Sequence, residues 1–216
     1  MEQRKLLGLG LRLLGVAVIG YVVYAVFGSL FPTDSWPPKN EQEEEKLIAG
    51  YKEKLALPDN PFSTRKPEDI PVYLSRIIDH DARKGDVKSA RDYIGQAIGQ
   101  KVDGQVETLV RSEEARALID KVRNALKKQE ELNGIVAQYE KRPGAEAAPD
   151  VREKFDREFR ARVEQFCRIP FDAAVCPEQA EEIARTFKAK LEPAGKDPRL
   201  KDVIADIEKN CLPPRK

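Results

Sequence analysis

Three cysteines are the first residues of this 216-residue chain whose chemistry could define a site: Cys167, Cys176 and Cys211. None of them forms a CxxC pair, which excludes a thioredoxin-type redox centre and a c-type haem attachment. In an oxidising compartment two of the three can form a disulfide, and all three pairings are open. We favour Cys167–Cys176, because the short intervening loop keeps these residues close, and this choice leaves Cys211 unpaired. Cys167 and Cys211 also lie on apolar helix faces, so each could instead be a buried core residue.

The remaining candidates for catalysis are one histidine and many carboxylates. His80 lies in the sequence Asp79-His80-Asp81, whose members do not share a helix face and therefore make a poor metal chelate. We expect a solvated surface histidine, and a lone histidine leaves few routes to a catalytic triad. A carboxylate pair can cleave a glycosidic bond, but no pair stands out among the helix charges. The sequence therefore predicts no catalytic residue, no metal ligand and no cofactor-binding residue.

An apolar segment near the start of the chain, residues 13–31, determines the compartment in which the cysteines lie. It carries no charged residue and has the length of about 20 residues that a membrane-spanning helix requires. The apolar part of a signal peptide is shorter, roughly 7 to 15 residues. The best cleavage candidate, Val26-Phe27-Gly28, matches the small-residue rule poorly. We therefore predict a retained, single-pass transmembrane anchor that contacts the lipid bilayer directly.

Flanking charges orient this predicted anchor. Arg4, Lys5 and Arg12 precede it, whereas acidic residues dominate after it, and Lys and Arg stay on the cytoplasmic side. Residues 1–12 are therefore a short cytoplasmic tail, and the rest of the chain faces the periplasm from the inner (cytoplasmic) membrane. A mitochondrial inner-membrane protein that faces the intermembrane space has the same pattern.

Two tyrosines near the middle of the predicted anchor suggest a contact with a second membrane helix. A hydroxyl in the bilayer needs an acceptor, and small residues let two helices approach closely. The residues of this predicted membrane-helix contact are Tyr21, Tyr24, Ala25 and Ser29. The alternative is that the tyrosines are apolar enough to be tolerated in lipid.

Composition favours solvated helices for the exported region. Charged residues make up 35% of the chain and aromatic residues only 7%. The formal net charge is +1, so the chain carries no excess of basic charge that would favour nucleic acid as a partner.

Helical periodicity and proline-rich breaks divide this exported region into three parts. Residues 32–68 are a Pro-rich stalk with a short amphipathic helix, which Asn40 and Glu43 begin as a capping pair. Residues 69–141 form a helical hairpin plus a long heptad-like helix. A linker around Gly144 follows, and residues 150–212 form a three-helix unit that contains the cysteines. The predicted fold class is all-α, with a single transmembrane helix followed by a helical-bundle exported region.

The most regular pattern lies in residues 112–141, where apolar residues recur at alternating intervals of three and four. The predicted interaction seam consists of Leu118, Val122, Leu132, Val136 and Tyr139. Ile119 and Ile135 widen this stripe beyond a strict heptad seam, which favours an internal bundle helix. The alternative is a coiled coil that joins subunits, including a homo-oligomer.

Amphipathic helices without an assembled reactive site favour a function in protein–protein interaction. We expect a membrane-anchored, periplasm-facing helical scaffold or assembly subunit of an envelope or membrane protein complex. Its expected partners are other membrane or periplasmic proteins. The alternative is an anchored carboxylate-dependent enzyme or a ligand-binding accessory factor, which a concave site with convergent carboxylates would favour.

Overall fold

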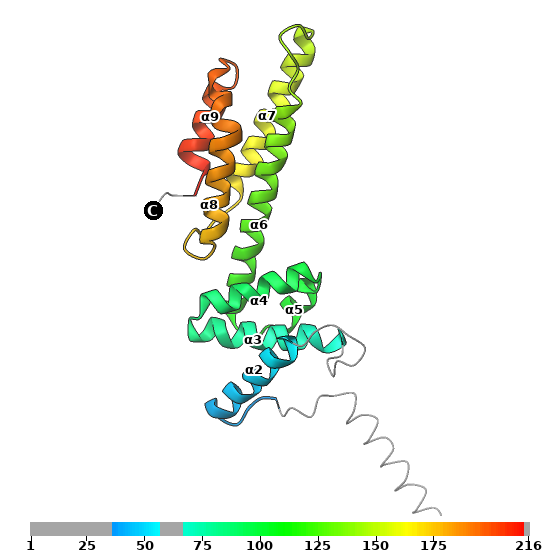
Figure 1. Cartoon of the computed structure of the whole chain (residues 1–216), viewed down its shortest axis with the longest axis vertical. Helices are drawn as coiled ribbons and strands as arrows, with labels where there is room; N and C mark the ends of the chain where they lie inside the picture. The colour runs from blue at the N-terminus through cyan, green and yellow to red at the C-terminus, as the bar shows by residue number, and fades with distance from the viewer. Residues whose placement is uncertain (1–35, 57–66, 214–216) are drawn as a thin grey trace, which may run out of the picture. The chain divides into compact units, whose positions relative to one another are not determined.

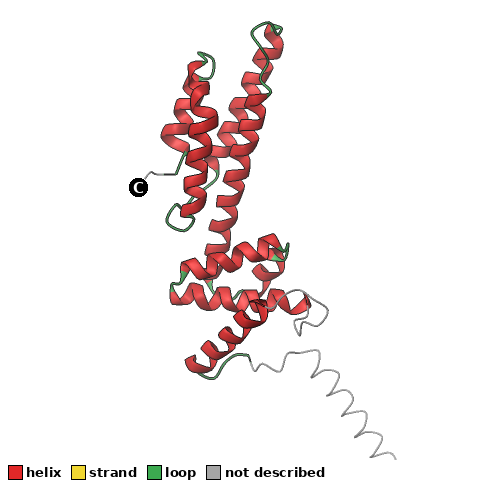
Figure 2. Ribbon diagram, in the orientation of Figure 1, coloured by secondary structure: helices red, strands yellow, loops and turns green. Residues whose placement is uncertain are grey.

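The structure, a computed structural model, describes residues 36–56 and 67–213 (Figure 1). Every regular element in these ranges is helical, which confirms the all-α prediction (Figure 2). None of the helices in these ranges combines the length and apolar character needed to cross a bilayer. The predicted anchor, residues 13–31, lies outside the described residues. The chain divides into two compact units, Met1–Gly50 and Tyr51–Lys216.

The first described helix, α2 (Glu41–Ala56), crosses from the first unit into the second. Its N-terminus is capped as the sequence predicts, because the Glu43 backbone N–H donates to Asn40 Oδ1 at 2.9 Å. The Glu43 carboxylate in turn accepts a hydrogen bond from the Lys39 backbone N–H at 2.8 Å. The first bond satisfies a donor that the first helical turn leaves without an intrahelical partner, and the second satisfies the N–H of the residue before the N-cap.

The first core of the second unit is built from α3 (Ile70–Lys84), α4 (Val87–Gly99), α5 (Asp103–Leu109) and the first half of α6 (Glu113–Glu140). The 3₁₀ turn Pro67–Asp69 precedes α3. Helix α3 ends at Gly85, whose φ of 76° lies in the left-handed region that glycine adopts without a steric cost. Asp86 then begins α4 by accepting a hydrogen bond from the Ser89 backbone N–H at 3.0 Å.

The second core combines the second half of α6 with α7 (Pro149–Arg168), α8 (Pro177–Thr186) and α9 (Lys201–Asp206). Helix α8 continues as the π-helical segment η2 (Phe187–Leu191), and α9 continues as the π-helical segment η4 (Ile207–Cys211). The 3₁₀ segment η3 (Glu192–Lys196) lies between them. Helices α7, α8 and α9 lie between Pro149 and Asp206, and the grouping of residues 150–212 as a unit of its own stays a prediction.

Helix α6 belongs to both cores, and its apolar stripe is covered by helices of the same chain. Leu118 and Val122 lie in the first core, and Leu132 and Val136 lie in the second. All four side chains are at most 9% exposed, and Tyr139 packs against the second core. The predicted seam is therefore internal core, and the alternative of a coiled coil through this stripe is wrong.

The predicted boundary around Gly144 also differs from the structure. Residues 142–148 connect α6 to α7 within the second core, and the two cores meet along α6 itself. The pattern misled because a Pro/Gly-rich loop marks a reversal of the chain, which occurs inside a helical hairpin as readily as between domains. Helix α5 was not predicted, because seven residues are too few to show a helical period.

Candidate functional site

Three of the buried polar or charged residues in the described part of the second unit, Ser75, Asp79 and Asp81, lie on α3. Asp79 is 4% exposed, and its carboxylate accepts hydrogen bonds from the backbone N–H groups of Arg111 and Ser112 at 2.9 to 3.0 Å. The Ser112 hydroxyl donates to the same carboxylate at 2.9 Å. Ser112 Oγ also accepts from the Ala115 backbone N–H, so it is the N-cap of α6 that the sequence predicts. Asp79 therefore fixes the start of α6 against α3.

Asp81 points to a second set of partners. Its carboxylate accepts hydrogen bonds from Lys52 Nζ at 2.9 Å, from Ser89 Oγ at 2.5 Å and from His80 Nδ1 at 2.8 Å. Burial opposes the ionisation of Asp81, but the bonds from Ser89, His80 and Lys52 outweigh it and hold the pKa of this carboxyl below its usual value. The cluster ties the last turns of α2 and the start of α4 to α3.

His80 is not the solvated surface residue that the sequence predicts. Its side chain is 13% exposed, and Nδ1 is held by the carboxylate of the adjacent Asp81. Nε2 is buried, and no hydrogen-bond partner for it lies among the described residues. A carboxylate that orients an imidazole is the arrangement of a general base, but a base must also reach a substrate proton, and this Nε2 has no exposed surface. The prediction failed because the tertiary packing of α3, not the spacing of Asp79-His80-Asp81, decides which side chains are covered.

A buried lysine at the junction of the two cores was also missed. Lys128 is 3% exposed, and its Nζ donates to the backbone carbonyls of Phe166 at 2.9 Å and Ile169 at 3.0 Å. It also lies 4.3 Å from the centre of the Phe166 ring. Burial lowers the pKa of the Lys128 ammonium to about 8. Lys128 precedes the buried Ile135 by one heptad, and this spacing was the available signal that it faces inward.

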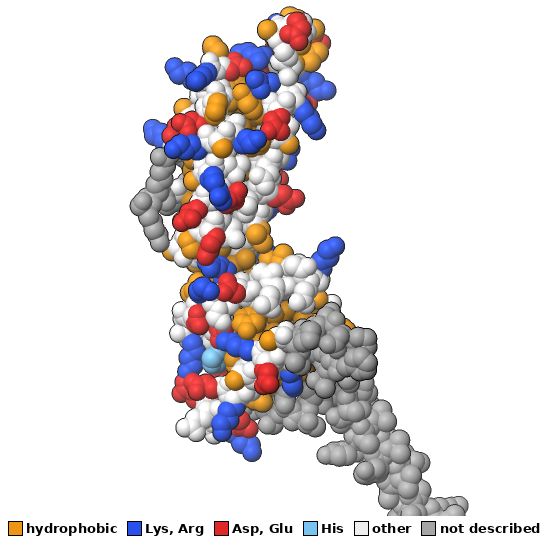
Figure 3. Space-filling model, viewed as in Figure 1, with side chains coloured by type: hydrophobic (Ala, Val, Ile, Leu, Met, Phe, Trp, Pro, Cys, Tyr) orange, Lys and Arg blue, Asp and Glu red, His pale blue; other side chains and the backbone are white. Residues whose placement is uncertain are grey.

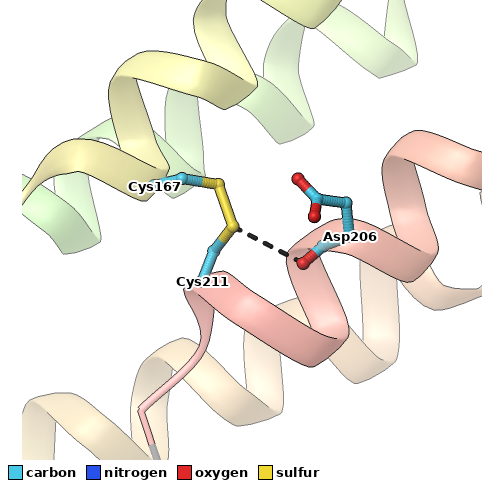
Figure 4. Close-up of side chains that lie close together, drawn as sticks. All are labelled: Cys167, Asp206 and Cys211. Carbon is cyan, nitrogen blue, oxygen red and sulfur yellow. Dashed lines mark hydrogen bonds between the residues drawn. A yellow bond between two sulfur atoms is a disulfide. The ribbon is translucent and has the colours of Figure 1, made fainter.

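The cysteine pairing differs from the prediction. Cys167, near the end of α7, forms a disulfide with Cys211 at the end of η4, and their Cα atoms are 4.7 Å apart (Figure 4). Cys176 is the free cysteine and is 1% exposed in the first core. Burial raises the pKa of its thiol. The short loop keeps Cys176 near Cys167 along the chain but directs its side chain into the other core, whereas η4 returns to the end of α7.

The described part of the second unit carries shallow grooves, of which two contain charged side chains. One has a volume of about 250 Å³ between α7 and α9, and it is lined by Arg160, Val163, Glu164, Asp202, Val203 and Asp206. The other has a volume of about 410 Å³ beside the end of α7, and it is lined by Asn124, Lys127, Glu131, Gln165, Arg168, Ile169 and Pro170. The first groove brings three carboxylates together, which the sequence did not single out among its many helix charges.

The predicted membrane-helix contact, Tyr21, Tyr24, Ala25 and Ser29, lies outside the described residues and stays a prediction. No family model, curated protein or solved structure matches the chain.

Proposed function

We propose that this protein is a membrane-anchored helical scaffold or assembly subunit, whose exported region binds other membrane or periplasmic proteins of an envelope complex. Residues 13–31 would cross the inner membrane once and leave the described helices on the periplasmic side. The Cys167–Cys211 disulfide supports a location outside the cytoplasm, because disulfides persist mainly in oxidising compartments.

The observation that carries the proposal is the use of α6 by both cores. A helix of 28 residues that contributes side chains to two hydrophobic clusters holds their surfaces in a fixed relation, as a scaffold requires. Lys128 and Asp79 reinforce this arrangement, since one joins α6 to the end of α7 and the other joins its start to α3.

The surface is suited to contacts with folded proteins. Side chains of Lys and Arg are interspersed with those of Asp and Glu on the face shown in Figure 3. Among the residues that the structure describes, Val87, Leu109 and Val151 are large apolar side chains exposed by 39% to 49%. Apolar contacts inside a polar rim are a common composition of protein–protein interfaces.

One observation favours the second candidate function, a ligand-binding accessory factor. The groove between α7 and α9 is lined by Glu164, Asp202 and Asp206 together with one arginine, Arg160. Its volume of about 250 Å³ is small for a drug-sized organic ligand but sufficient for a hydrated cation.

Site-specific photo-crosslinking in intact membranes tests the scaffold function. A photoreactive residue is placed at Val87, Leu109 or Val151 in the full-length protein, and at Lys88 or Arg168 as exposed polar controls. A scaffold predicts that at least one apolar position gives a crosslink to a defined membrane or periplasmic protein that the controls do not give. The same weak products at all five positions would contradict it.

A further inference from the structure

Asp206, which lines the groove between α7 and α9, also belongs to a cluster of three side chains that offer metal ligands. The sulfur atoms of Cys167 and Cys211 and a carboxylate oxygen of Asp206 all lie within 4.8 Å of one another. Figure 4 shows the Asp206 carboxylate beside the sulfur pair, with the Cys211 sulfur 3.6 Å from the Asp206 backbone oxygen. We propose that Cys167, Cys211 and Asp206 form a site for a single Zn²⁺ ion when the disulfide is reduced.

The π-helical turn of η4 is what places two of these ligands together. In an α-helix, residues five positions apart point about 140° away from each other, given 3.6 residues per turn. The bond from the Leu212 backbone N–H to the Ile207 carbonyl, at 3.1 Å, spans five residues and widens the turn. Asp206 and Cys211 therefore face the same side. Single π turns inside helices occur frequently at functional sites.

The ligand set fits zinc better than the hard cations. Two thiolates and one carboxylate suit Zn²⁺, which binds four ligands tetrahedrally, whereas Mg²⁺ and Ca²⁺ prefer oxygen ligands alone. With Zn–S bonds of about 2.3 Å, the two sulfurs must lie about 3.8 Å apart. The ion therefore requires that the two sulfurs are not bonded to each other. Water would complete the coordination, since Asp206 is exposed and lines the groove.

The disulfide and the metal ion therefore exclude each other. A dithiol reductant supplies two electrons and two protons to the S–S bond and becomes a disulfide itself, which leaves two protein thiols. Binding of Zn²⁺ then releases both thiol protons, because the ligands are thiolates. In either state the end of α7 stays joined to η4, by a covalent bond in the oxidised protein and by the ion in the reduced protein.

The test uses the full-length Cys176→Ser protein in detergent, so that the third thiol cannot contribute. After reduction with a phosphine, Co²⁺ is titrated as a probe, and Zn²⁺ is added to displace it. We expect a thiolate-to-Co²⁺ charge-transfer band that saturates at one ion per chain and disappears with Zn²⁺. The oxidised protein should show no such band. A reduced protein without the band, or an oxidised protein with it, would overturn the proposal.

Two matched variants test the carboxylate. Asp206→Asn should weaken Co²⁺ binding by about 10-fold or more, whereas Asp202→Asn, one turn earlier in the same groove, should leave it unchanged. Equal affinities of these variants would overturn the assignment of Asp206. Circular dichroism follows the fold: if reduction lowers the helicity, Zn²⁺ should restore it, because a ligand of the folded state favours that state. Lost helicity that Zn²⁺ does not restore would also overturn the proposal.

Discussion

Replacement of the buried lysine, Lys128→Met, should change how the stability of the protein depends on pH. In the folded protein the pKa of Lys128 is lowered from 10.5 to about 8 by burial, whereas in the unfolded chain the ammonium titrates near 10.5. Between these two values the unfolded chain binds more protons than the folded one. The free energy of unfolding of the wild type therefore rises as the pH increases through this window.

The magnitude follows from the two pKa values. At 1.36 kcal/mol per pH unit, the lowering from 10.5 to about 8 corresponds to at most about 3.4 kcal/mol, most of it gained between pH 8 and pH 10.5. Both carbonyl contacts of Nζ persist when the amine is neutral, because a neutral amine still donates hydrogen bonds. The methionine variant has no group that titrates at this position and should lack this rise.

Urea unfolding of the full-length protein in detergent, followed by far-ultraviolet circular dichroism at pH values from 7 to 11, measures the effect. The difference between wild type and Lys128→Met cancels the titration of the other lysines and tyrosines. Lys127→Met is the matched control, because Lys127 is the preceding residue of the same helix and its side chain is exposed. Parallel stability curves for wild type and Lys128→Met would refute the assignment of a buried, partly deprotonated lysine.

Four further predictions concern the disulfide and the helices. Cys211→Ser removes a cross-link between residues 44 positions apart and should lower the free energy of unfolding by about 4 kcal/mol, measured by urea unfolding of the oxidised proteins. Gly134→Ala should raise the melting temperature, since alanine favours the helix by about 1 kcal/mol and the added methyl meets only the flexible guanidinium of Arg162. Gly85→Ala should lower the free energy of unfolding by about 1 kcal/mol, measured by urea unfolding, because φ is 76° at this position. Leu132→Asp buries an unpaired charge and should cost more than about 3 kcal/mol; a variant that keeps its helicity and its mass would contradict the core assignment.

The helices could be predicted because their apolar residues repeat with the helical period. The caps Asn40 and Ser112 and the buried stripe of α6 follow from local spacing, and the structure confirms them. A periodic pattern shows which face of a helix is covered, and the unusual width of the α6 stripe correctly indicated cover from the same chain. It does not show where one core ends and the next begins.

The polar residues could not be placed in the same way. The partners of Lys128 and Cys211 lie on other elements of the chain. His80 contacts its neighbour Asp81, but its burial depends on packing that the local sequence does not specify. The cysteine pairing shows the limit most clearly. Proximity along the chain favoured Cys176, but the direction of its side chain is set by the core into which it packs. Only the return path of η4 along α7 determines the pair.

The shared helix also has a consequence for how the protein unfolds. Since α6 supplies one wall of each core, neither core can lose this helix without exposing apolar side chains of the other. Forming the first turn of a helix costs free energy, whereas extending the helix does not. When the packing of one core has formed α6, the other core therefore docks on a helix that already exists. The two cores should therefore open as one cooperative unit, and amides along the buried stripe of α6 should exchange with solvent only in the global transition. A protease that acts on transiently opened chains would then find few partly unfolded forms of this region to cut.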